Sequence, residues 1–563
     1  LGMMVIGTSA AAGYSDVDAE DNVEAIEVLQ AIEVMVGDDR GFGPDRPVTR
    51  AEMAVVMGKL LSLDYNYYAT SCPFTDVPTW AQGCVGACYA NGIVSGRTAT
   101  TYDPNASVTA VEAASMMMRA LGYFKYPSDY ADGFVLSTVR QASKIGLFAD
   151  VNADTSAPMT RNQVAQLALN TLENAVVEAK KSSADITVGS GDTAVTITGA
   201  VEYVVRTSQE DFAKAINNKD QGNTSTTGRN GYTIELGEQL YNGDLVKRET
   251  TNDFQDPAVK WTYKTKEIGI YAKSADLTYL DEVKLKDIYK DLSLSAEPDE
   301  LVFAVNGDIS ATDNDGDAVT AIKTNDGKVG GKGAVVKVYS EEPTANHIKV
   351  TISVTEYYLA KAVADYNADD EELDVELKSD VRDLNENGDT LKLEDFPNIA
   401  GVKKGEYLVV TIAKNGSDYD IKTVAPAELI ENVTVTSARA DDYVMAGEKY
   451  VYSDISKKED SGALGQDLMN DASGYDLKGN GYNLYLDPNG YVLGVESYDG
   501  GVNMGNYLFI KDVSNSGFDI IAKAVFSDGT SKTINVTKLD DEDVDDEADV
   551  DEDKFYKFSV SGD

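Results

Sequence analysis

One segment in the second half of the chain carries carboxylate and amide side chains at the spacing of a calcium-binding loop. Oxygen ligands that alternate along a loop, followed by a glycine and closed by a glutamate at the twelfth position, wrap around Ca²⁺. This loop has Thr390 where such loops carry an aliphatic residue, and its flanks have the pattern of strands, so a β-hairpin that turns at Asn387-Gly388 is the alternative. The candidate ligands are Asp383, Asn385, Asn387, Asp389 and Glu394.

Two other segments are rich in carboxylates. Asp313, Asp315 and Asp317 surround Gly316 and form a second candidate calcium turn. Residues 540–553 contain eleven acidic residues in fourteen. A run of like charges of this kind is typical of a solvated linker rather than of a defined ion site. We therefore expect no required cofactor, with Ca²⁺ as the one ion that the acidic segments could bind.

Residues typical of catalysis are sparse. His347 is the one histidine of the chain, and it lies in a strand-like stretch where a structural role is the default. The sequence has no glycine-rich phosphate loop, no His-Glu-x-x-His and no paired-cysteine metal motif. Coincidental carboxylate pairs are inevitable among 95 acidic residues, and only Trp261 lies outside the first third of the chain to line a sugar-binding cleft. The sequence therefore predicts that the protein is not an enzyme.

Three cysteines lie within seventeen residues. Cys84 and Cys88 are four residues apart and would share one face of a helix, while Cys72 precedes a strand-like start. An exported protein can form disulfides, and we expect one between Cys72 and Cys88, with Cys84 free. A zinc site is the alternative, but the segment has no nearby histidine and no fourth thiolate.

The elements that position side chains are clearest in the first third of the chain, where three short stretches read Thr-x-x-Glu/Gln. This is the pattern of a helix-capping box, in which the threonine hydroxyl accepts from an amide of the first turn and the Glu/Gln side chain bonds back to the threonine amide. The stretches are spaced by 60 and 51 residues, which indicates internal repeats. They are Thr49-Arg50-Ala51-Glu52, Thr109-Ala110-Val111-Glu112 and Thr160-Arg161-Asn162-Gln163, and the helical runs that they open are Met53–Leu61, Ala113–Leu121 and Val164–Leu172.

The segments upstream of the capping boxes repeat as well. Tyr14-Ser15-Asp16-Val17 matches Phe74-Thr75-Asp76-Val77, and an amphipathic helix follows each of them. An aromatic-x-Pro element then precedes the capping threonine, Phe42-Gly43-Pro44 in the first copy and Tyr102-Asp103-Pro104 in the second. The third copy keeps a helix around Thr138–Ile145 but lacks the aromatic-x-Asp-Val start.

The order aromatic-x-Asp-Val, helix, Gly-Ile-x-x-Gly, aromatic-x-Pro, Thr-Arg-Ala-Glu and second helix resembles the S-layer homology (SLH) family over residues 13–180. The resemblance implies three tandem modules that form a helical pseudo-trimer. Its grooves bind an anionic secondary cell-wall polysaccharide on the peptidoglycan, often one that bears a pyruvate ketal. The repeats would span residues 13–68, 69–125 and 126–183.

Matching the family motif assigns candidate polysaccharide-binding residues. A residue just after a capping threonine lies at the positive end of its helix, where free amides and a guanidinium can meet a carboxylate. The motif therefore assigns the charged contact to arginines, and the groove walls to aspartates and a tryptophan. Alternatively, the aspartates hold turns, the tryptophan is core and the arginines are solvated surface charges. The candidates are Arg50, Arg161, Asp16, Asp76 and Trp80.

The three repeats differ in their motif residues. The first has the complete Thr-Arg-Ala-Glu but no tryptophan, the second has Ala110 in place of the arginine, and the third lacks the aromatic start. We therefore expect only one or two of the three grooves to bind polymer.

Charge and an apolar leader indicate a protein that works outside the cell. Residues 1–12 are uncharged, and Ala10 and Ala12 fit the cleavage pattern of a secretory signal whose basic start is missing; an ordinary buried segment is the alternative. The net charge of −46 argues against nucleic-acid binding. No apolar run reaches the ~20 residues of a membrane-spanning helix. The sequence therefore predicts a secreted protein of the bacterial cell wall or surface.

Beyond residue 183, Val, Ile, Thr and Tyr alternate with polar residues in short segments, separated by turns such as Asp487-Pro488-Asn489-Gly490. This pattern predicts mainly-β, sandwich-like domains, two within 184–430 and one over 431–563. The fold class is therefore multidomain, with the all-α repeats first. We expect a wall-anchored structural protein of the S-layer type, whose acidic β domains self-associate or contact partners. The alternatives are an adhesin and a wall-anchored hydrolase with its catalytic part in 185–563 or beyond.

Overall fold

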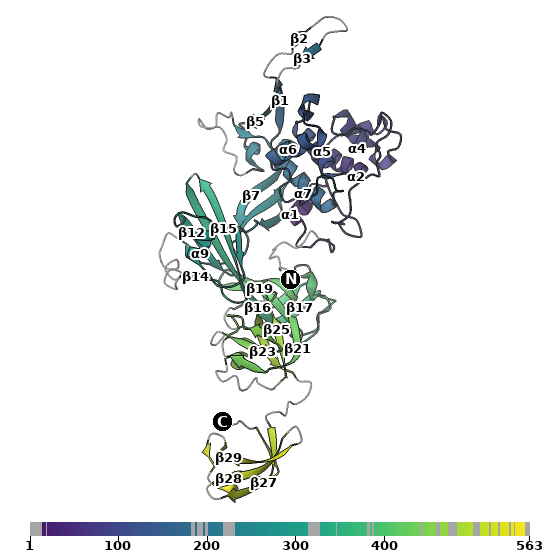
Figure 1. Ribbon diagram of the computed structural model, residues 1–563. Coiled ribbons are helices and arrows are strands. Elements are labelled where there is room, and N and C mark those ends of the chain that lie inside the picture. Colours follow the sequence, from purple (N-terminus) through teal and green to yellow (C-terminus); the bar gives the residue numbers. More distant parts are fainter. Residues whose placement is uncertain are drawn as a thin grey trace. The chain divides into compact units, whose positions relative to one another are not determined.

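The computed structural model separates into two compact units, of which one ends at Ser274 and the other begins at Ala275 (Figure 1). The leader 1–12 and the candidate calcium residues Asp313, Asp315, Asp317 and Asn387 lie outside the described residues. The structure describes residues 14–18, 20–181, 186–188, 195–197, 201–217, 231–312, 327–344, 346–379, 383–385, 388–439, 442–457, 462–470, 481–498, 507–516, 519–526, 530–539, 542–544 and 546–557.

Helices form the first part of the first unit. They are α1 (Val23–Ala31), α2 (Arg50–Leu60), α3 (Tyr65–Tyr68), α4 (Thr79–Ala90), α5 (Ala110–Leu121), η1 (Pro127–Tyr130), α6 (Phe134–Lys144) and α7 (Arg161–Leu172). Thr49, Thr109 and Thr160 each form the predicted capping box with the residue three positions later, which confirms the second helix of each repeat. Within the described part of the chain, no helix has the length and apolarity needed to cross a membrane.

The three chain segments that lead into α2, α5 and α7 meet in a ring of main-chain hydrogen bonds. Val48 donates to Met159 at 2.9 Å, Met159 donates to Val108 at 3.0 Å, and Val108 donates to Val48 at 2.9 Å. The side chains of all three residues are buried, with at most 2% exposure. Because the ring closes on itself, each repeat contacts the other two, and each capping segment lies at a junction between repeats.

A three-stranded antiparallel sheet completes the core of the first unit. Its strands are β7 (Leu245–Thr251), β8 (Pro257–Tyr263) and β9 (Lys266–Ala272). Trp261 on β8 is fully buried, and its indole Nε1 donates to Glu24 of α1 at 2.6 Å. Tyr271 on β9 donates to Glu27 of the same helix, and the Glu27 residue is 8% exposed. The expected boundary near residue 184 therefore lies inside a single hydrophobic core, and the compact division comes at residue 274.

Short elements connect the helices to this sheet. They are β1 (Val177–Lys181), β2 (Ile186–Val188), β3 (Val195–Ile197), β4 (Val201–Val205), β5 (Thr207–Ser208), η3 (Asp211–Lys214), β6 (Tyr232–Thr233) and α8 (Leu236–Tyr241). β1 pairs with β4, β2 with β3 and β5 with β6, all antiparallel.

The second unit is mainly β, as the sequence predicts. Its first elements are β10 (Leu277–Tyr279), β11 (Val283–Lys284), α9 (Leu285–Asp291), β12 (Glu300–Val305), β13 (Asp308–Thr312), β14 (Lys328–Val329), β15 (Ala334–Thr344), β16 (His347–Ala362), β17 (Glu372–Leu377), β18 (Thr390–Lys392), η4 (Pro397–Ile399), β19 (Tyr407–Asn415) and β20 (Asp418–Pro426). A nine-stranded sheet is organised around the long strand β16, which pairs with β12 in parallel and with β15, β17 and β19 in antiparallel order.

Smaller sheets make up the rest of the second unit. Their elements are β21 (Glu428–Thr434), β22 (Ser437–Arg439), β23 (Tyr443–Ala446), β24 (Glu448–Val451), α11 (Gln466–Met469), β25 (Gly481–Leu486), β26 (Val492–Ser497), β27 (Tyr507–Ser516), β28 (Asp519–Phe526), β29 (Ser531–Val536), β30 (Lys538–Leu539), β31 (Glu542–Asp543), η6 (Glu547–Asp549) and β32 (Lys554–Lys557). The sheet orders are β21-β25-β26, β22-β23-β24 and β29-β28-β27-β32. The predicted turn at residues 487–490 joins β25 to β26, whereas sandwich-like packing of the sheets stays a prediction.

The described part of the acidic segment 540–553 packs against the four-stranded sheet β29-β28-β27-β32. In its described part, β31 pairs with β30, and β32 directly follows the segment and pairs with β27. Val550 is 5% exposed within the core of this sheet, and Val544 packs against the same core. The acidic side chains of the segment whose burial is described are exposed, as predicted, but the segment is not a free linker, because these two apolar residues pack on the core.

The three cysteines, all within the described residues, are free thiols. Cys84 and Cys88 are buried on α4, and the Sγ atom of Cys88 lies 3.5 Å from the carbonyl oxygen of Ala54 on α2. Burial raises the pKa of Cys88 to about 12. The predicted Cys72–Cys88 disulfide is therefore wrong: Cys88 packs as a small apolar residue between two helices.

Candidate functional site

The first residue of α2 places a buried guanidinium between the first two repeats. Arg50 is 9% exposed; its Nε donates to the Tyr102 carbonyl at 3.1 Å and its Nη2 to the Ser95 carbonyl at 3.0 Å. The guanidinium carbon lies 4.6 Å from the centroid of the Tyr102 ring, and Nη1 lies 3.6 Å from a Glu112 oxygen. Arg50 therefore joins repeat one to repeat two, and its remaining nitrogen lies near a carboxylate.

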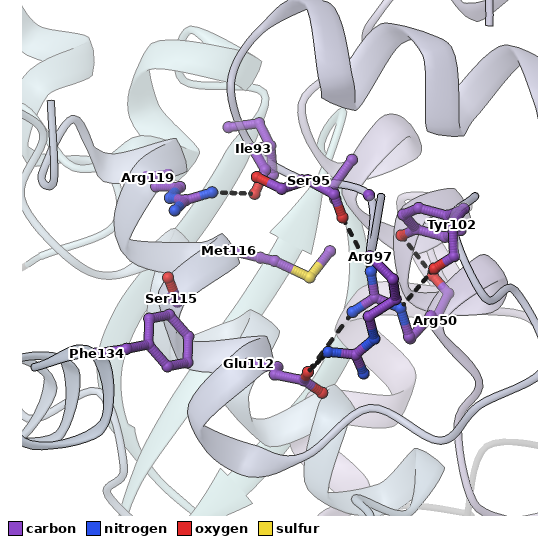
Figure 2. Close-up of a pocket in the computed structure, with 12 residues that line it drawn as sticks. Arg50, Ile93, Ser95, Arg97, Tyr102, Glu112, Ser115, Met116, Arg119 and Phe134 are labelled. Carbon is purple, nitrogen blue, oxygen red and sulfur yellow. Dashed lines mark hydrogen bonds and ion pairs between the residues drawn. The ribbon is translucent and has the colours of Figure 1, made fainter. Parts of the chain in front are cut away.

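A pocket of about 200 Å³ lies beside this guanidinium, and Figure 2 shows two further arginines in its wall. Arg97 is half exposed, and its Nη1 lies 3.1 Å from Glu112. Arg119 donates from Nη2 to the Tyr130 hydroxyl at 3.1 Å. With Arg50, the lining residues include three guanidinium groups and one carboxylate, which gives a net charge of three minus one, or +2. An anionic ligand fits such a pocket because each guanidinium can make charge-assisted hydrogen bonds.

Arg161, the first residue of α7, repeats this arrangement between the third and first repeats. Its Nε donates to the Phe42 carbonyl at 2.7 Å and its Nη2 to the Val36 carbonyl at 3.0 Å. The guanidinium lies 4.4 Å from the centroid of the Phe42 ring. Burial, together with the nearby charge of Arg46, lowers the pKa of Arg161. A second pocket, of about 240 Å³, adjoins this arginine.

The second pocket has less unpaired positive charge than the first. Arg40 pairs with Asp38 at 2.6 Å, and Arg46 pairs with Glu52 at 2.7 Å. Its lining residues include three arginines and two aspartates, or a net charge of +1. The pocket beside Arg50 is therefore the stronger candidate for an anion.

The two aspartates of the aromatic-x-Asp-Val elements hold the aromatic-x-Pro turns. Asp16 accepts from the amides of Phe42 at 2.8 Å and Gly43 at 2.7 Å. Asp76 makes the same pair of bonds in the second repeat, both at 2.8 Å, with Tyr102 and the residue after it. Burial raises the pKa of each carboxyl, but the amide donors outweigh it and the net shift is downward. These contacts match the turn-holding alternative.

Known cell-surface proteins resemble this chain. A surface-layer 125 kDa protein of Lysinibacillus sphaericus is 28% identical over 360 residues, which are 57% of this chain and 30% of that protein. A cell surface protein of Thermoanaerobacter kivui is 28% identical over 187 residues, 31% of this chain and 23% of that protein. An endoglucanase of Bacillus sp. (strain KSM-635) is 32% identical over 107 residues, 18% of this chain and 11% of that protein. The chain thus matches less than a third of the length of each relative.

The family model of the S-layer homology domain matches residues 13–54 and 73–114. The chain is an SLH-containing cell-surface protein. Both matched segments run from the aromatic-x-Asp-Val element into the capped helix, so the first includes Arg50 and the second includes Arg97. The matches and the surface-layer relatives confirm the expected location on the bacterial cell wall or surface. The third repeat lies outside the matched residues, so its assignment to the SLH family stays a prediction.

The remaining motif positions differ in residue type and surroundings from one repeat to the next, as the sequence predicts. Trp80 is 62% exposed on α4, which excludes a core role, but it is not among the residues that line the two pockets. Between the second and third repeats, Ala110 is fully buried at the position that Arg50 and Arg161 occupy in the other two repeats. The structure therefore separates the predicted residues: Arg50 lies in one pocket, and Arg161 lies with Asp16 in the other.

The candidate calcium loop lies in the second unit, among strands rather than helices. Strand β17 precedes the loop, and strand β18 (Thr390–Lys392) lies within it, just before Glu394, and pairs with β17. The Asn385 amide donates to the Asn415 carbonyl at 3.0 Å and to Asp420 at 2.8 Å, while Asp389 and Glu394 are exposed. Among the residues that the structure describes, no three His, Cys, Asp or Glu side chains are grouped to hold a metal ion. Calcium binding stays a prediction.

Two arginines of the first pocket were missed from the sequence, although it carries signals for both. Arg97 directly follows Gly96, the last residue of the Gly-Ile-x-x-Gly element. Arg119 follows Glu112 by seven residues, which places both on one face of α5. The aromatic side chain of Phe134, which also lines the pocket, comes from the third repeat, and no spacing rule connects it to the two arginines.

Proposed function

We propose that this chain anchors non-covalently to the cell wall by binding an anionic secondary cell-wall polysaccharide in the pocket between the first two SLH repeats. The observation that carries the proposal is the excess of three guanidinium groups over one carboxylate in a pocket of sugar-accommodating size. A carboxylate on the polymer, such as a pyruvate ketal, supplies the matching charge. The closed ring of Val48, Val108 and Met159 supports a pseudo-trimeric arrangement of the repeats.

Replacing Arg97 or Arg119 by alanine in the full chain is expected to weaken binding to purified cell walls by about tenfold each, because each change removes one charge-assisted contact. Arg50 and Arg161 are less suitable targets, since two nitrogens of each bond to main-chain carbonyls of the neighbouring repeat. Arg119 bonds to the carbonyls of Gly92 and Ile93 within its own repeat and reaches the next repeat only through the Tyr130 hydroxyl. The measurement is sedimentation of the protein with walls at fixed ionic strength, before and after the polysaccharide is stripped.

A matched control removes an arginine outside the pocket. Arg140 on α6 pairs with Asp132 and is exposed, so Arg140→Ala should leave wall binding unchanged. Binding that survives removal of the polysaccharide would exclude the polymer as receptor. Equal binding by the wild type, Arg97→Ala and Arg119→Ala would exclude this pocket.

We propose further that the acidic β part assembles laterally in a surface layer and has a structural rather than catalytic role. The surface-layer relative matches 57% of this chain, more than the helical repeats account for, whereas the endoglucanase matches 18%. A chain with a net charge of −46 repels its own copies unless cations screen it. Adding Ca²⁺ to the full chain is therefore expected to produce two-dimensional assemblies in electron micrographs. Protein that stays dispersed in Ca²⁺, as in a sodium control, would contradict this proposal.

A further inference from the structure

Helix α6 of the third repeat turns apolar side chains outward. Phe134, Val135 and Leu136 are 43%, 57% and 52% exposed, whereas Ser137 and Thr138 of the same helix are buried. Scattered apolar residues are common on protein surfaces, but three in succession at the start of a helix form a patch. Such a patch next to a pocket indicates contact with a ligand or a partner.

One residue of this patch, Phe134, also lines the pocket between the first two repeats. It lines the pocket beside Ser115 of α5, and Figure 2 shows it on the side opposite Arg50 and Arg97. Arg50 and Arg97 therefore lie on one side of the pocket, and Phe134 of repeat three lies on the other, where Arg119 also stands. Val135 and Leu136 are outside the set of residues that line it.

Aromatic contacts support the ring of Phe134. Its centroid lies 5.9 Å from that of Tyr130, which stacks on Phe124 at 4.6 Å. The Tyr130 hydroxyl in turn accepts from Arg119 of the pocket. A ring held in this way loses little conformational freedom when a ligand covers it, and such preorganisation favours binding.

We propose that Phe134 binds the apolar face of the sugar residue whose acidic group the arginines hold, so that the third repeat sets the specificity of the pocket between the first two. The inference rests on the proposed function and names a further determinant of the same site. A sugar ring presents C–H groups on its faces and hydroxyl groups at its rim. Small-molecule sites commonly combine apolar or aromatic walls with a few polar groups that fix orientation. The ligand is therefore an anionic sugar with one open apolar face.

Phe134→Ala in the full chain is expected to weaken binding of the solubilised wall polysaccharide about tenfold, and Phe134→Tyr to retain it. Val135→Ala is the matched control, because Val135 is exposed on the same turn but does not line the pocket. Both positions are exposed, so the melting temperature should stay unchanged in all three variants. The measurement is titration calorimetry with purified polysaccharide.

Three outcomes separate the inference from the proposed function. If Phe134→Ala binds like the wild type while Arg97→Ala binds weakly, the inference is wrong and the proposed function stands. If both variants bind like the wild type, the proposed function fails. If Phe134→Ala instead lowers self-association in analytical ultracentrifugation, with polysaccharide binding unchanged, the patch binds a second copy of the chain and the inference is overturned.

Discussion

Trp261→Ala is expected to lower the free energy of unfolding of the first unit by about 3–5 kcal/mol. The indole is fully buried between the β7–β9 sheet and α1, and its Nε1 donates to Glu24. Truncation would leave a cavity and would also leave the half-buried Glu24 carboxylate without this donor, which adds a desolvation penalty. Since the sheet and the repeats share one core, the helical signal should be lost at lower denaturant together with the sheet.

The chain supplies a matched control in its other tryptophan. Trp80 is 62% exposed, so Trp80→Ala should change the free energy of unfolding by less than about 0.5 kcal/mol. Urea unfolding of the full chain, followed by circular dichroism at 222 nm, reports the helices of the repeats. If Trp261→Ala left that helical transition unchanged, the repeats would fold independently of the sheet, and a boundary near residue 184 would be restored.

The features of the repeats that the sequence predicted correctly depend on short-range contacts. Each capping box joins Thr49, Thr109 or Thr160 to a residue three positions away, so its pattern is visible in a four-residue window. The alternation of apolar and polar residues predicted the mainly-β second unit for the same reason.

The roles of the motif arginines depend on contacts across the repeats. The carbonyl partners of Arg50 lie 45 and 52 residues away along the chain, and those of Arg161 lie 119 and 125 residues away. Motif matching assigned both arginines to a ligand, but two nitrogens of each guanidinium bond to the main chain of the next repeat. Only the geometry shows that Arg97, whose side chain is half exposed, carries the more accessible charge of the first pocket.

The domain boundary was misplaced because α1 looks like an ordinary amphipathic helix. Glu24 and Glu27 read as solvated charges until the fold covers them with Trp261 and Tyr271, which are 237 and 244 residues away. The change from helical to strand pattern near residue 184 is real, but a change of secondary structure does not mark the edge of a core.

Glu27→Gln is expected to raise the free energy of unfolding of the first unit at pH 8 by about 2–3 kcal/mol and to leave it nearly unchanged near pH 4. Burial raises the pKa of Glu27 from 4.5 to about 7, although the hydrogen bond from Tyr271 opposes the shift. Between these values the folded protein keeps a proton that the unfolded chain releases. The stabilisation that the protonated Glu27 carboxyl contributes is therefore fully present below pH 4.5 and is lost as the pH rises through 7. Glutamine, which is neutral throughout, abolishes this loss.

The wild type and Glu27→Gln are compared by urea unfolding from pH 4 to 8. The difference between their free energies of unfolding isolates the effect of this carboxyl from that of the other acidic groups of the chain. Glu33→Gln removes an exposed carboxylate just beyond α1 and should give a difference below about 0.5 kcal/mol at every pH. Tyr271→Phe removes the donor that lowers the pKa of Glu27, so it should move the loss of stability to higher pH. If the difference in the free energy of unfolding did not change between pH 5 and 8, Glu27 would be solvated and α1 would not pack on the sheet. A sloping difference would show that protonation of Glu27 stabilises the packing of α1, the first helix of the first repeat, on the β7–β9 sheet. The stability of the repeats would then depend on pH near neutrality.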